Sequence, residues 1–309
     1  MFRHPFCLIA AALFATSAQA QLPAPVVTRD ADGLVTISPV PGAVVFYTIN
    51  GNPPDKASGV YMGPFHLPYK ATVHARVIGE SPAVSVPFEA IGDVPTPPRS
   101  LIPVTQNRNW ALYDWQERHK TTCKLVREKQ PNLLLIGDSI THFMPKEVWA
   151  KYYEPLNAVN LGYGWDRTEN VLWRMQNGEL DGYSPKAAMV MIGTNSVEGD
   201  SAEAVAEGVR AICTEINKRH PATKILLLGI FPRGEKPGGV RLKIDEVNRL
   251  LAAFDGRNNI TYLDIGGKFL DPDGLIPRGV MGDFLHPTPK GHEIWAEAVA
   301  PVIQKLLGE

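Results

Sequence analysis

The feature that most constrains the fold of this chain is an alternation of short apolar runs with amphipathic segments over its C-terminal two thirds. Strands that alternate with helices form a parallel sheet that helices cover on both faces. Apolar residues in the intervening segments recur at helical spacing, as Val205, Val209 and Ile212 do. We therefore expect a three-layer α/β domain, flavodoxin-like, with a five-stranded parallel sheet. The expected strands are residues 132–136, 158–161, 187–192, 224–228 and 260–263.

Chemically active residues follow the ends of these strands. Ser139 lies just after the first strand, Gly162 just after the second and Asn195 just after the third. Asp283 and His286 lie shortly before the last expected helix. In an open sheet of this kind, ligands bind beyond the carboxyl ends of the strands, so these residues should share one rim. A hydroxyl nucleophile, a base with a carboxylate beside it and amide donors are the groups that acyl transfer needs.

Each of these residues has a role that the chemistry of acyl transfer defines. The hydroxyl of Ser139 is a poor nucleophile and needs a base to take its proton. His286 is of the side-chain type that titrates near neutrality, and Asp283 can orient its ring. The peptide N–H groups of Ser139 and Gly162, with the Asn195 amide, can stabilise the negative oxygen of the tetrahedral intermediate. This mechanism requires no metal or other cofactor, and the spacing of Cys and His offers no set of metal ligands.

Each motif taken alone has another explanation. The serine of a Gly-Asp-Ser motif is often only a helix N-cap, and an asparagine after a strand often belongs to a turn. The combination of these motifs in this order, each at the end of a strand, favours a serine hydrolase. The remaining histidines outside the first twenty residues lack such a context, so we expect structural or solvent-exposed positions for them. They are His66, His74, His119, His142, His220 and His292.

Several short motifs carry a resemblance to a known family. They are residues 137–141 (Gly-Asp-Ser-Ile-Thr), 166–174, 177–180, 185–186, 191–195, 232–237 and 283–286. Through them, the segment from Asn132 to the C-terminus resembles the SGNH (GDSL-type) hydrolases, and within them the catalytic subunits of platelet-activating factor acetylhydrolase. The resemblance implies that the four signature residues are Ser139, Gly162, Asn195 and His286. It also implies esterase, lipase, thioesterase or carbohydrate deacetylase activity.

One position departs from the pattern of that family. Where relatives typically carry paired glycines before Asp-Arg-Thr, this chain has Gly164 followed by Trp165. We expect Trp165 either to point into the cleft, where its ring could stack on a sugar, or to pack under a neighbouring loop. Two further candidate contacts with substrate are Asp138 and Arg233, although a surface turn explains Arg233 equally well.

The residues after Trp165 are expected to stabilise the loop locally. Asp166 and Arg167 can form an ion pair and a helix cap, with Glu169 as the second residue of a capping box.

Residues 21–92 have a different pattern, with short runs of branched and aromatic residues between turn residues. This spacing predicts a small all-β sandwich. Residues 47–54, 59–65 and 73–77 resemble the small domain at the C-terminus of chitobiases and β-hexosaminidases. Three aromatic residues of this segment are expected in its core, with a sugar-binding surface as the alternative. They are Tyr47, Tyr61 and Phe65.

Two segments flank this β-rich part. Residues 1–20 combine a basic start, an apolar run from Phe6 to Phe14 and a small-residue Ala-Gln-Ala site. This pattern predicts a secretory signal peptide, and with it a secreted or periplasmic protein. Residues 93–108 are rich in proline and predict a stiff linker, so the hydrolase domain would span residues 109–309.

Charge and cysteine content narrow the remaining possibilities. The formal net charge of −1 provides no broad basic field for nucleic acid or an anionic membrane. Outside the predicted signal peptide the chain has only Cys123 and Cys213, which can form a disulfide or remain separate buried thiols.

The sequence favours a small-molecule or polysaccharide ester as substrate. We expect an acetylesterase that acts on O-acetyl groups of carbohydrate, because the predicted export, the chitobiase-like domain and Trp165 all suit a sugar. One alternative is an esterase for short-chain phospholipids or aryl esters, or a lysophospholipase. Another is a carbohydrate-binding protein that keeps the fold without hydrolysis.

Overall fold

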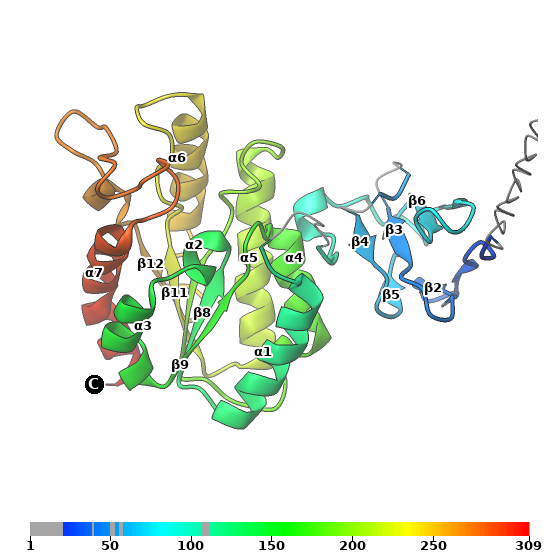
Figure 1. Cartoon of the computed structure of the whole chain (residues 1–309), viewed down its shortest axis with the longest axis horizontal. Helices are drawn as coiled ribbons and strands as arrows, with labels where there is room; N and C mark the ends of the chain where they lie inside the picture. The colour runs from blue at the N-terminus through cyan, green and yellow to red at the C-terminus, as the bar shows by residue number, and fades with distance from the viewer. Residues whose placement is uncertain (1–20, 39, 50–52, 56–57, 107–111, 309) are drawn as a thin grey trace, which may run out of the picture.

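The computed structural model describes residues 21–308 apart from 39, 50–52, 56–57 and 107–111. The signal peptide predicted over residues 1–20 lies outside them. Figure 1 shows a small β-rich part near the N-terminus and a larger α/β part that continues to the C-terminus.

The larger part is built on one five-stranded sheet with the strand order β12-β11-β10-β8-β9, and every neighbouring pair is parallel. The register places Gly137, at the end of β8, beside Gly162 of β9 and Met191 of β10. The carboxyl ends of these three strands therefore meet at one rim. The predicted flavodoxin-like α/β fold is confirmed. The strands are β8 (Leu133–Gly137), β9 (Ala158–Gly162), β10 (Ala187–Met191), β11 (Lys224–Leu228) and β12 (Ile260–Leu263).

Helices cover both faces of this sheet. Residues of α1, α4, α5 and α6 share one hydrophobic cluster with Leu134 and Ile136 of β8. Residues of α2, α3 and α7 share a second cluster with Leu133 and Leu135. Because successive side chains of a strand point to opposite faces, β8 is buried along its whole length. The helices are α1 (Trp115–Lys129), α2 (Ser139–His142), α3 (Lys146–Tyr152), α4 (Thr168–Arg174), α5 (Ala202–Arg219), α6 (Gly239–Ala252) and α7 (Pro289–Leu307).

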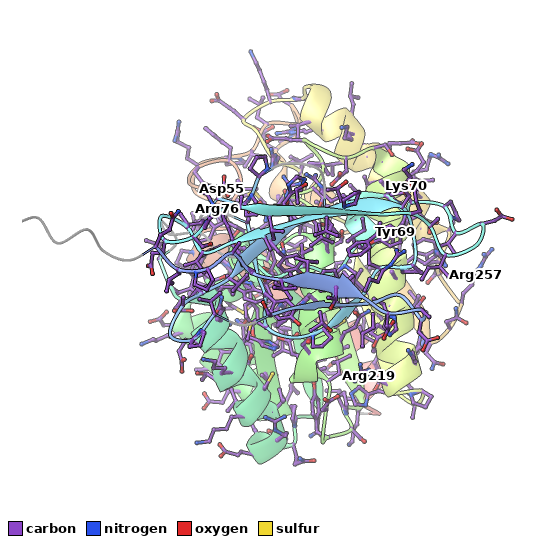
Figure 2. The ribbon with its side chains drawn as sticks, turned by 90° about the vertical axis from the view of Figure 1, so that its right-hand side faces the viewer. Asp55, Tyr69, Lys70, Arg76, Arg219 and Arg257 are labelled. Atoms are coloured by element: carbon purple, nitrogen blue, oxygen red, sulfur yellow. The ribbon has the colours of Figure 1, made fainter. Side chains whose placement is uncertain are left out.

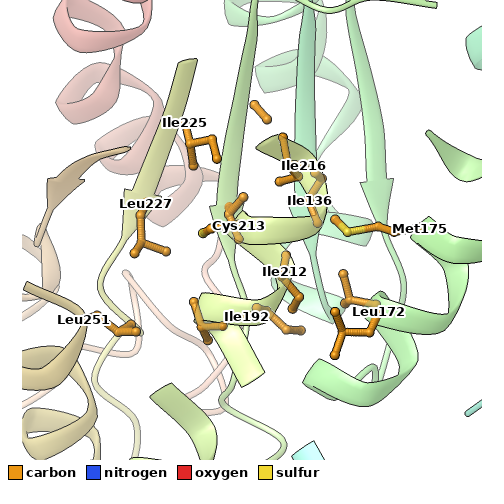
Figure 3. Packing of buried hydrophobic residues seen from close by; sticks show 14 of the residues in the cluster. Ile136, Leu172, Met175, Ile192, Ile212, Cys213, Ile216, Ile225, Leu227 and Leu251 are labelled. Carbon is orange, nitrogen blue, oxygen red and sulfur yellow. The ribbon is translucent and has the colours of Figure 1, made fainter. Parts of the chain in front are cut away.

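The first of these clusters is shown in Figure 3, where Ile212, Cys213 and Ile216 of α5 lie among apolar side chains of the sheet and of α4. Full burial of an aliphatic side chain of this size contributes roughly 1.5–3 kcal/mol. Cys213 and Cys123 are both free and buried, so of the two alternatives the structure shows separate thiols. Burial raises the pKa of each thiol to about 12. No helix of the described residues is both long and apolar enough to cross a membrane.

The smaller part, called here the β domain, consists of two antiparallel sheets. Figure 2 looks onto it, with Arg76 at one end of β6 and Lys70 just before the other end. The predicted all-β fold of this part is confirmed. One sheet has the order β1 (Val27–Arg29), β2 (Leu34–Ile37), β5 (Phe65–His66), and the other the order β4 (Gly59–Val60), β3 (Phe46–Thr48), β6 (Ala71–Arg76), β7 (Val84–Phe88).

The aromatic residues of the β domain contribute to its core. Tyr47 is buried, its ring stacks on that of Phe65 at 4.9 Å between centroids, and it meets Tyr61 edge-on at 6.3 Å. Tyr61 and Phe65 are partly buried against the same hydrophobic cluster. The structure therefore favours the core alternative for these rings.

The segment between the two parts is attached to both. Thr96 donates from Oγ1 to the Lys70 carbonyl in the β domain at 3.1 Å. Farther along, residues 99–101 form a short 3-10 helix, and the Ser100 carbonyl accepts the Thr168 hydroxyl of α4 at 3.1 Å. Residues 99–101 of the predicted linker thus pack on the α/β part. The predicted limits of the domains and of the linker stay a prediction.

Strand β9 forms one edge of the central sheet, and α1 lies along it. Arg118 of α1 donates from Nε to the Gly162 carbonyl (3.0 Å) and from Nη2 to the Asn160 carbonyl (3.3 Å). Lys129 donates from Nζ to the Ala158 carbonyl at 2.8 Å. These bonds fix α1 beside the strand that leads into the rim.

Candidate active site

The structure brings Ser139, His286 and Asp283 into one hydrogen-bonded chain. Ser139 Oγ lies 2.9 Å from His286 Nε2, and His286 Nδ1 lies 2.7 Å from Asp283 Oδ2. The serine and the histidine are 147 positions apart in the sequence, so the fold creates their contact. Ser139 begins α2 directly after β8, and the other two residues lie in the loop before α7. The predicted nucleophile, base and carboxylate are thus adjacent in space.

The loop that carries Asp283 also fixes its orientation. Its Oδ1 accepts the N–H groups of Leu285 (3.0 Å) and His286 (2.7 Å), while its Oδ2 faces the imidazole. Partial burial acts to raise the pKa of Asp283, but these hydrogen bonds outweigh it and hold the pKa below its usual value. The carboxylate therefore stays ionised and keeps the ring proton on Nδ1, which leaves Nε2 as an acceptor for Ser139.

The turn from β8 into α2 has little free space. A Cβ at Gly137 would lie 2.2 Å from Thr141 Oγ1 and 2.7 Å from the Met191 carbonyl oxygen. Asp138 caps α2, because its Oδ1 accepts the Ile140 N–H at 3.0 Å. Its side chain is 1% exposed and faces the protein interior, so the predicted contact between Asp138 and substrate is wrong.

Gly162, predicted as an oxyanion donor, has a different role. Its N–H donates to Asn160 Oδ1 at 2.8 Å, and Asn160 Nδ2 donates to the Thr141 carbonyl at 2.7 Å. A Cβ at Gly162 would lie 2.3 Å from the main-chain nitrogen of His142. Gly162 therefore lets β9 and α2 approach closely, and its N–H is already used within the protein. The prediction that this N–H binds the oxyanion is wrong.

The loop after β9 makes a tight turn over residues 163–166, closed by a hydrogen bond from its last N–H to its first carbonyl at 3.1 Å. Within the turn only Trp165 has a positive φ, 64°, which is the pattern of a type II turn. The half-buried Trp165 ring lies 6.4 Å from the Tyr113 ring and 6.3 Å from the Phe143 ring, between centroids. Packing against loop residues, one of the two alternatives for Trp165, is thus observed, and its contact with substrate stays a prediction.

Three side chains hold Gly164 within this turn. The Gly164 N–H donates to His142 Nδ1 at 3.2 Å. The Gly164 carbonyl accepts the Tyr113 hydroxyl at 3.0 Å and Gln106 Nε2 at 3.2 Å. Burial, with help from nearby arginines, lowers the pKa of His142 to about 3, so its neutral ring can accept a hydrogen bond. His142 therefore has a structural position, as expected, and its ring supports the turn at the rim.

Asn195 reaches the same turn from the end of β10. Its Nδ2 donates to the Asp166 carbonyl at 3.0 Å. Gly193, two residues earlier, has a φ of 131°, and a Cβ there would lie 2.7 Å from Ile230 Cδ1. The Asn195 amide is thereby tied to the residue that follows Trp165, as the shared rim predicts.

A buried charge cluster of Asp166, Arg174 and Glu179 lies beneath the turn, and all three side chains are fully buried. Arg174 Nε donates to Asp166 Oδ2 at 2.8 Å, and Arg174 Nη1 forms an ion pair with Glu179. Asp166 Oδ1 also accepts Trp115 Nε1 at 2.7 Å and Gln106 Nε2 at 2.6 Å. Burial raises the pKa of Asp166 to about 6, although Arg174 opposes this shift.

Two local interactions predicted for this loop are wrong. Asp166 pairs with Arg174 and not with Arg167, because tertiary contacts enclose its side chain. The capping box of Asp166 and Glu169 does not form. The residue before α4 is Arg167, whose N–H donates to Asn170 Oδ1 at 3.0 Å.

Arg233 connects two loops of the rim. Its Nη1 donates to the Thr194 carbonyl at 3.0 Å, and its Nη2 forms an ion pair with Glu198. The guanidinium therefore holds the loop after β10 against the loop after β11. This arrangement supports the turn alternative for Arg233 and gives no support to a contact with substrate.

Sequence reasoning missed three contacts that support the site, those of Asn160, Tyr113 and Gln106. The role of Asn160 could have been suspected from the sequence, because it is a polar residue inside an otherwise apolar strand. The role of Gln106 could not, since it lies at the end of a Pro-rich stretch that resembles a linker.

Comparison with protein families agrees with this geometry. The profile of the GDSL-like lipase/acylhydrolase family matches residues 135–294. The profile of the chitobiase/beta-hexosaminidase C-terminal domain matches residues 28–87. Both resemblances deduced from the motifs are confirmed.

Individual relatives extend this result. The alpha2 subunit of platelet-activating factor acetylhydrolase IB from Rattus norvegicus is 41% identical over 197 residues, which is 63% of this chain and 86% of that subunit. The human alpha1 subunit is 36% identical and covers 63% of this chain and 85% of its own length. A GDSL-like lipase structure from Bacteroides thetaiotaomicron shares the fold, with a TM-score of 0.53, 17% identity and coverage of 61% of this chain and 97% of its own. The chain is therefore a carboxylic ester hydrolase and belongs to the GDSL-like lipase/acylhydrolase family.

Proposed function

We propose that the protein is a serine esterase that removes short acyl groups, above all acetyl, through an acyl-enzyme on Ser139. The observation that carries this proposal is the hydrogen-bonded chain from Ser139 Oγ through His286 to Asp283. A serine becomes nucleophilic near neutral pH when a positioned base takes its proton. Here the base and the carboxylate that orients it are both in place.

The reaction has two halves. In the first, His286 Nε2 takes the proton of Ser139 as Oγ bonds to the ester carbonyl carbon, and the carbonyl electron pair moves to oxygen. When this pair re-forms the carbonyl, the bond to the alcohol breaks, and His286 returns its proton to the leaving oxygen. In the second half, water loses a proton to the same nitrogen and attacks the acyl-enzyme, which releases the acid and restores Ser139. Asp283 stays ionised and stabilises the imidazolium formed in each half.

We place the oxyanion among the N–H groups of Ser139 and Trp165 and the side-chain amide of Asn195. A trans peptide is planar, so the Trp165 N–H points opposite to the Gly164 carbonyl, which is directed at Tyr113 and Gln106. The Asn195 amide binds at the same turn. Loss of one such donor lowers kcat by roughly 10²–10³-fold in hydrolases of this kind.

We further propose that the natural substrate carries O-acetyl groups on carbohydrate. The match of residues 28–87 to a domain of carbohydrate enzymes supports this, as does the half-buried indole of Trp165 beside the rim. An indole face suits the apolar face of a sugar ring. The acetyl group is favoured because the curated relatives are acetylhydrolases.

A second candidate substrate is an acetylated phospholipid. It is favoured by the names of the relatives, which are subunits of platelet-activating factor acetylhydrolase.

One assay separates the two candidates. Acetate release is measured from acetylated xylan, xyloglucan and chitin oligomers and from a phospholipid with an sn-2 acetyl group, with p-nitrophenyl acetate as a generic ester and Ser139→Ala as the control. A kcat/KM at least about tenfold higher on one acetylated oligosaccharide than on the phospholipid supports the carbohydrate proposal. The reverse order assigns the phospholipid. Hydrolysis of p-nitrophenyl acetate that persists in Ser139→Ala would contradict the mechanism through an acyl-enzyme on Ser139.

We also propose that the protein is exported to the periplasm or the medium. The support is the signal-peptide pattern of residues 1–20, with a small-residue site before Gln21. Mass spectrometry of the mature protein should find Gln21 as its first residue. A mature protein that keeps residues 1–20 would contradict the proposal.

A further inference from the structure

Thr105 and Gln106 link the β domain to the turn that carries Trp165. The Thr105 hydroxyl accepts the Val60 N–H and donates to the Val60 carbonyl at 2.9 Å, so one side chain binds both backbone groups of that residue. Val60 belongs to β4, one of the two edge strands of the four-stranded sheet. Thr105 is thereby fixed by the β domain, and Gln106 is the next residue. Both side chains are buried.

Gln106 binds the turn on both sides of Trp165. Its Nε2 donates to the Gly164 carbonyl at 3.2 Å and to Asp166 Oδ1 at 2.6 Å. The Asp166 carbonyl in turn accepts the Asn195 amide. One amide nitrogen therefore stabilises the peptide before Trp165 and the residue that orients Asn195.

This contact matters because the turn has a conformation that tryptophan disfavours. The left-handed region is sterically disfavoured for any residue with a Cβ, and Trp165 has a φ of 64°. The type I turn suits such a residue better and differs from type II by a rotation of the central peptide. That rotation would reverse the directions of the Gly164 carbonyl and the Trp165 N–H. Hydrogen bonds to the Gly164 carbonyl oppose it.

We propose that Gln106 is a positioning residue for the oxyanion site. It holds the Gly164–Trp165 peptide in the orientation in which the Trp165 N–H faces the oxyanion, and its anchor through Thr105 makes this orientation depend on the β domain. The proposal rests on the esterase function proposed above, since an oxyanion forms only if Ser139 attacks an ester. It gives the β domain a part in the rate of hydrolysis that is separate from the binding of carbohydrate.

The first test compares full-length Gln106→Leu and Thr105→Val with a matched control. Thr223→Val is the control, because the buried Thr223 hydroxyl donates to the Pro185 carbonyl, away from the rim. Kinetics with p-nitrophenyl acetate should show kcat lowered roughly tenfold to a hundredfold in Gln106→Leu and roughly threefold to tenfold in Thr105→Val, with KM within about threefold. Thr223→Val should keep its kcat within about twofold.

A second readout follows the oxyanion site directly. Phenylboronic acid bonds to the serine oxygen and forms a tetrahedral anion that resembles the intermediate. Its inhibition constant should rise in Gln106→Leu by about the same factor as kcat/KM falls, because both depend on the same donors. A residue that only stabilised the fold would not change this constant in proportion to the rate.

The third arm is a rescue. Glycine adopts a positive φ without strain, so a turn in which glycine replaces Trp165 no longer needs the same restraint. The double variant Gln106→Leu with Trp165→Gly should therefore recover at least about tenfold in kcat on p-nitrophenyl acetate relative to Gln106→Leu alone.

These experiments test the role of Gln106 separately from the esterase function. Gln106→Leu with kcat within about twofold of the full-length protein, or a loss of kcat with neither rescue nor a change in boronate inhibition, would overturn the proposal. If Gln106→Leu does not fold, Thr105→Val tests the same link through kcat and the boronate, and unchanged values would overturn the proposal as well. A different result, hydrolysis that persists in Ser139→Ala, would contradict the esterase function.

Discussion

Ser139, His286 and Asp283 meet because Ser139 begins α2 after a tight connection and the other two residues lie in a loop that its own hydrogen bonds fix. Gly137 leaves room for the turn into α2, where any Cβ would overlap Thr141. In the loop before α7, the Asp283 carboxylate accepts two N–H groups of its own loop and so presents its other oxygen to the ring. Main-chain geometry therefore sets the positions of Ser139 and Asp283, the proposed nucleophile and carboxylate.

Replacement of the nucleophile is the most direct test at this scale. Ser139→Ala should lower kcat/KM on p-nitrophenyl acetate by roughly 10³-fold or more while the protein stays folded, because no other group takes over the acyl transfer. Near-normal turnover by pure Ser139→Ala would contradict the mechanism.

The role of Trp165 in substrate choice gives a second test. Trp165→Gly should raise KM for an acetylated oligosaccharide by roughly threefold to tenfold, because the ring surface for the sugar is lost. It should also reduce the preference for p-nitrophenyl acetate over the butyrate ester. Unchanged KM and acyl preference, with a lowered melting temperature, would leave Trp165 with a packing role alone.

Asp138 should make stability depend on pH. Burial raises its pKa to about 7, although the Ile140 N–H and nearby His286 oppose this, while an unfolded chain keeps an ordinary value near 3.9. Between these values the folded protein binds more protons, so this group lowers the free energy of unfolding as the pH rises from about 4 to about 7.

Asp138→Asn keeps an oxygen for the Ile140 N–H and does not titrate. The free energy of unfolding of Asp138→Asn minus that of the unmodified protein should be larger by roughly 2 kcal/mol at about pH 8 than at about pH 5. Urea denaturation at both pH values measures this difference. The same difference at both pH values would show that Asp138 does not titrate in the folded protein over this range.

Single residues also show where sequence reasoning stops. Ser139, Asp283, His286 and Asn195 could be predicted as candidates because each follows a strand or precedes a helix in a set order. The oxyanion role predicted for the Gly162 N–H is wrong, because the Asn160 side chain accepts this N–H and no local sequence pattern reports such a bond.

At the scale of elements, the strands were well predicted and the turns between them were not. The expected strand 132–136 and the observed β8 (Leu133–Gly137) differ by one residue at each end, since a strand buried on both faces is a continuous apolar run. The start of α4 was misjudged because Asp166 looked like a helix cap. In the fold its side chain instead receives Gln106, Trp115 and Arg174, which come from three distant segments.

The charge cluster under this turn should be important for stability. Arg174→Met leaves Asp166 and Glu179 buried without a cation, which should lower the free energy of unfolding by roughly 3–5 kcal/mol. The control is Arg249→Met, which removes an exposed pair with Glu246 and should cost less than about 1 kcal/mol. Urea denaturation compares the two. A similar small loss in both variants would show that the cluster adds little.

At the scale of the whole molecule, the two parts are joined by a segment that belongs structurally to both. Thr96 binds the β domain, Ser100 binds α4, and Thr105 returns to Val60 of the β domain. The composition of residues 93–108 predicts a spacer. Its proline content does not report the buried Thr105 hydroxyl and Gln106 amide within the same segment. The β domain is thus a neighbour of the active-site rim as well as a separate core.

Removal of the β domain tests how independent the larger part is. A fragment of residues 98–309 keeps Gln106 but loses Val60, and its own core should let it fold. Its kcat on p-nitrophenyl acetate should be roughly threefold to tenfold lower than that of the full chain, and its action on acetylated polymer should fall further. An insoluble or inactive fragment would show that the two parts form one folding unit.

The arginine and lysine that lie along β9 have a consequence for the behaviour of the protein in concentrated solution. An open sheet edge with unpaired carbonyls is where another chain can add a strand, and aggregation often begins there. Arg118 and Lys129 occupy the carbonyls of Ala158, Asn160 and Gly162, so an incoming strand would find those acceptors taken and would have to displace two cations. Through these two side chains, α1 therefore disfavours the addition of a strand from another chain at this edge of the sheet.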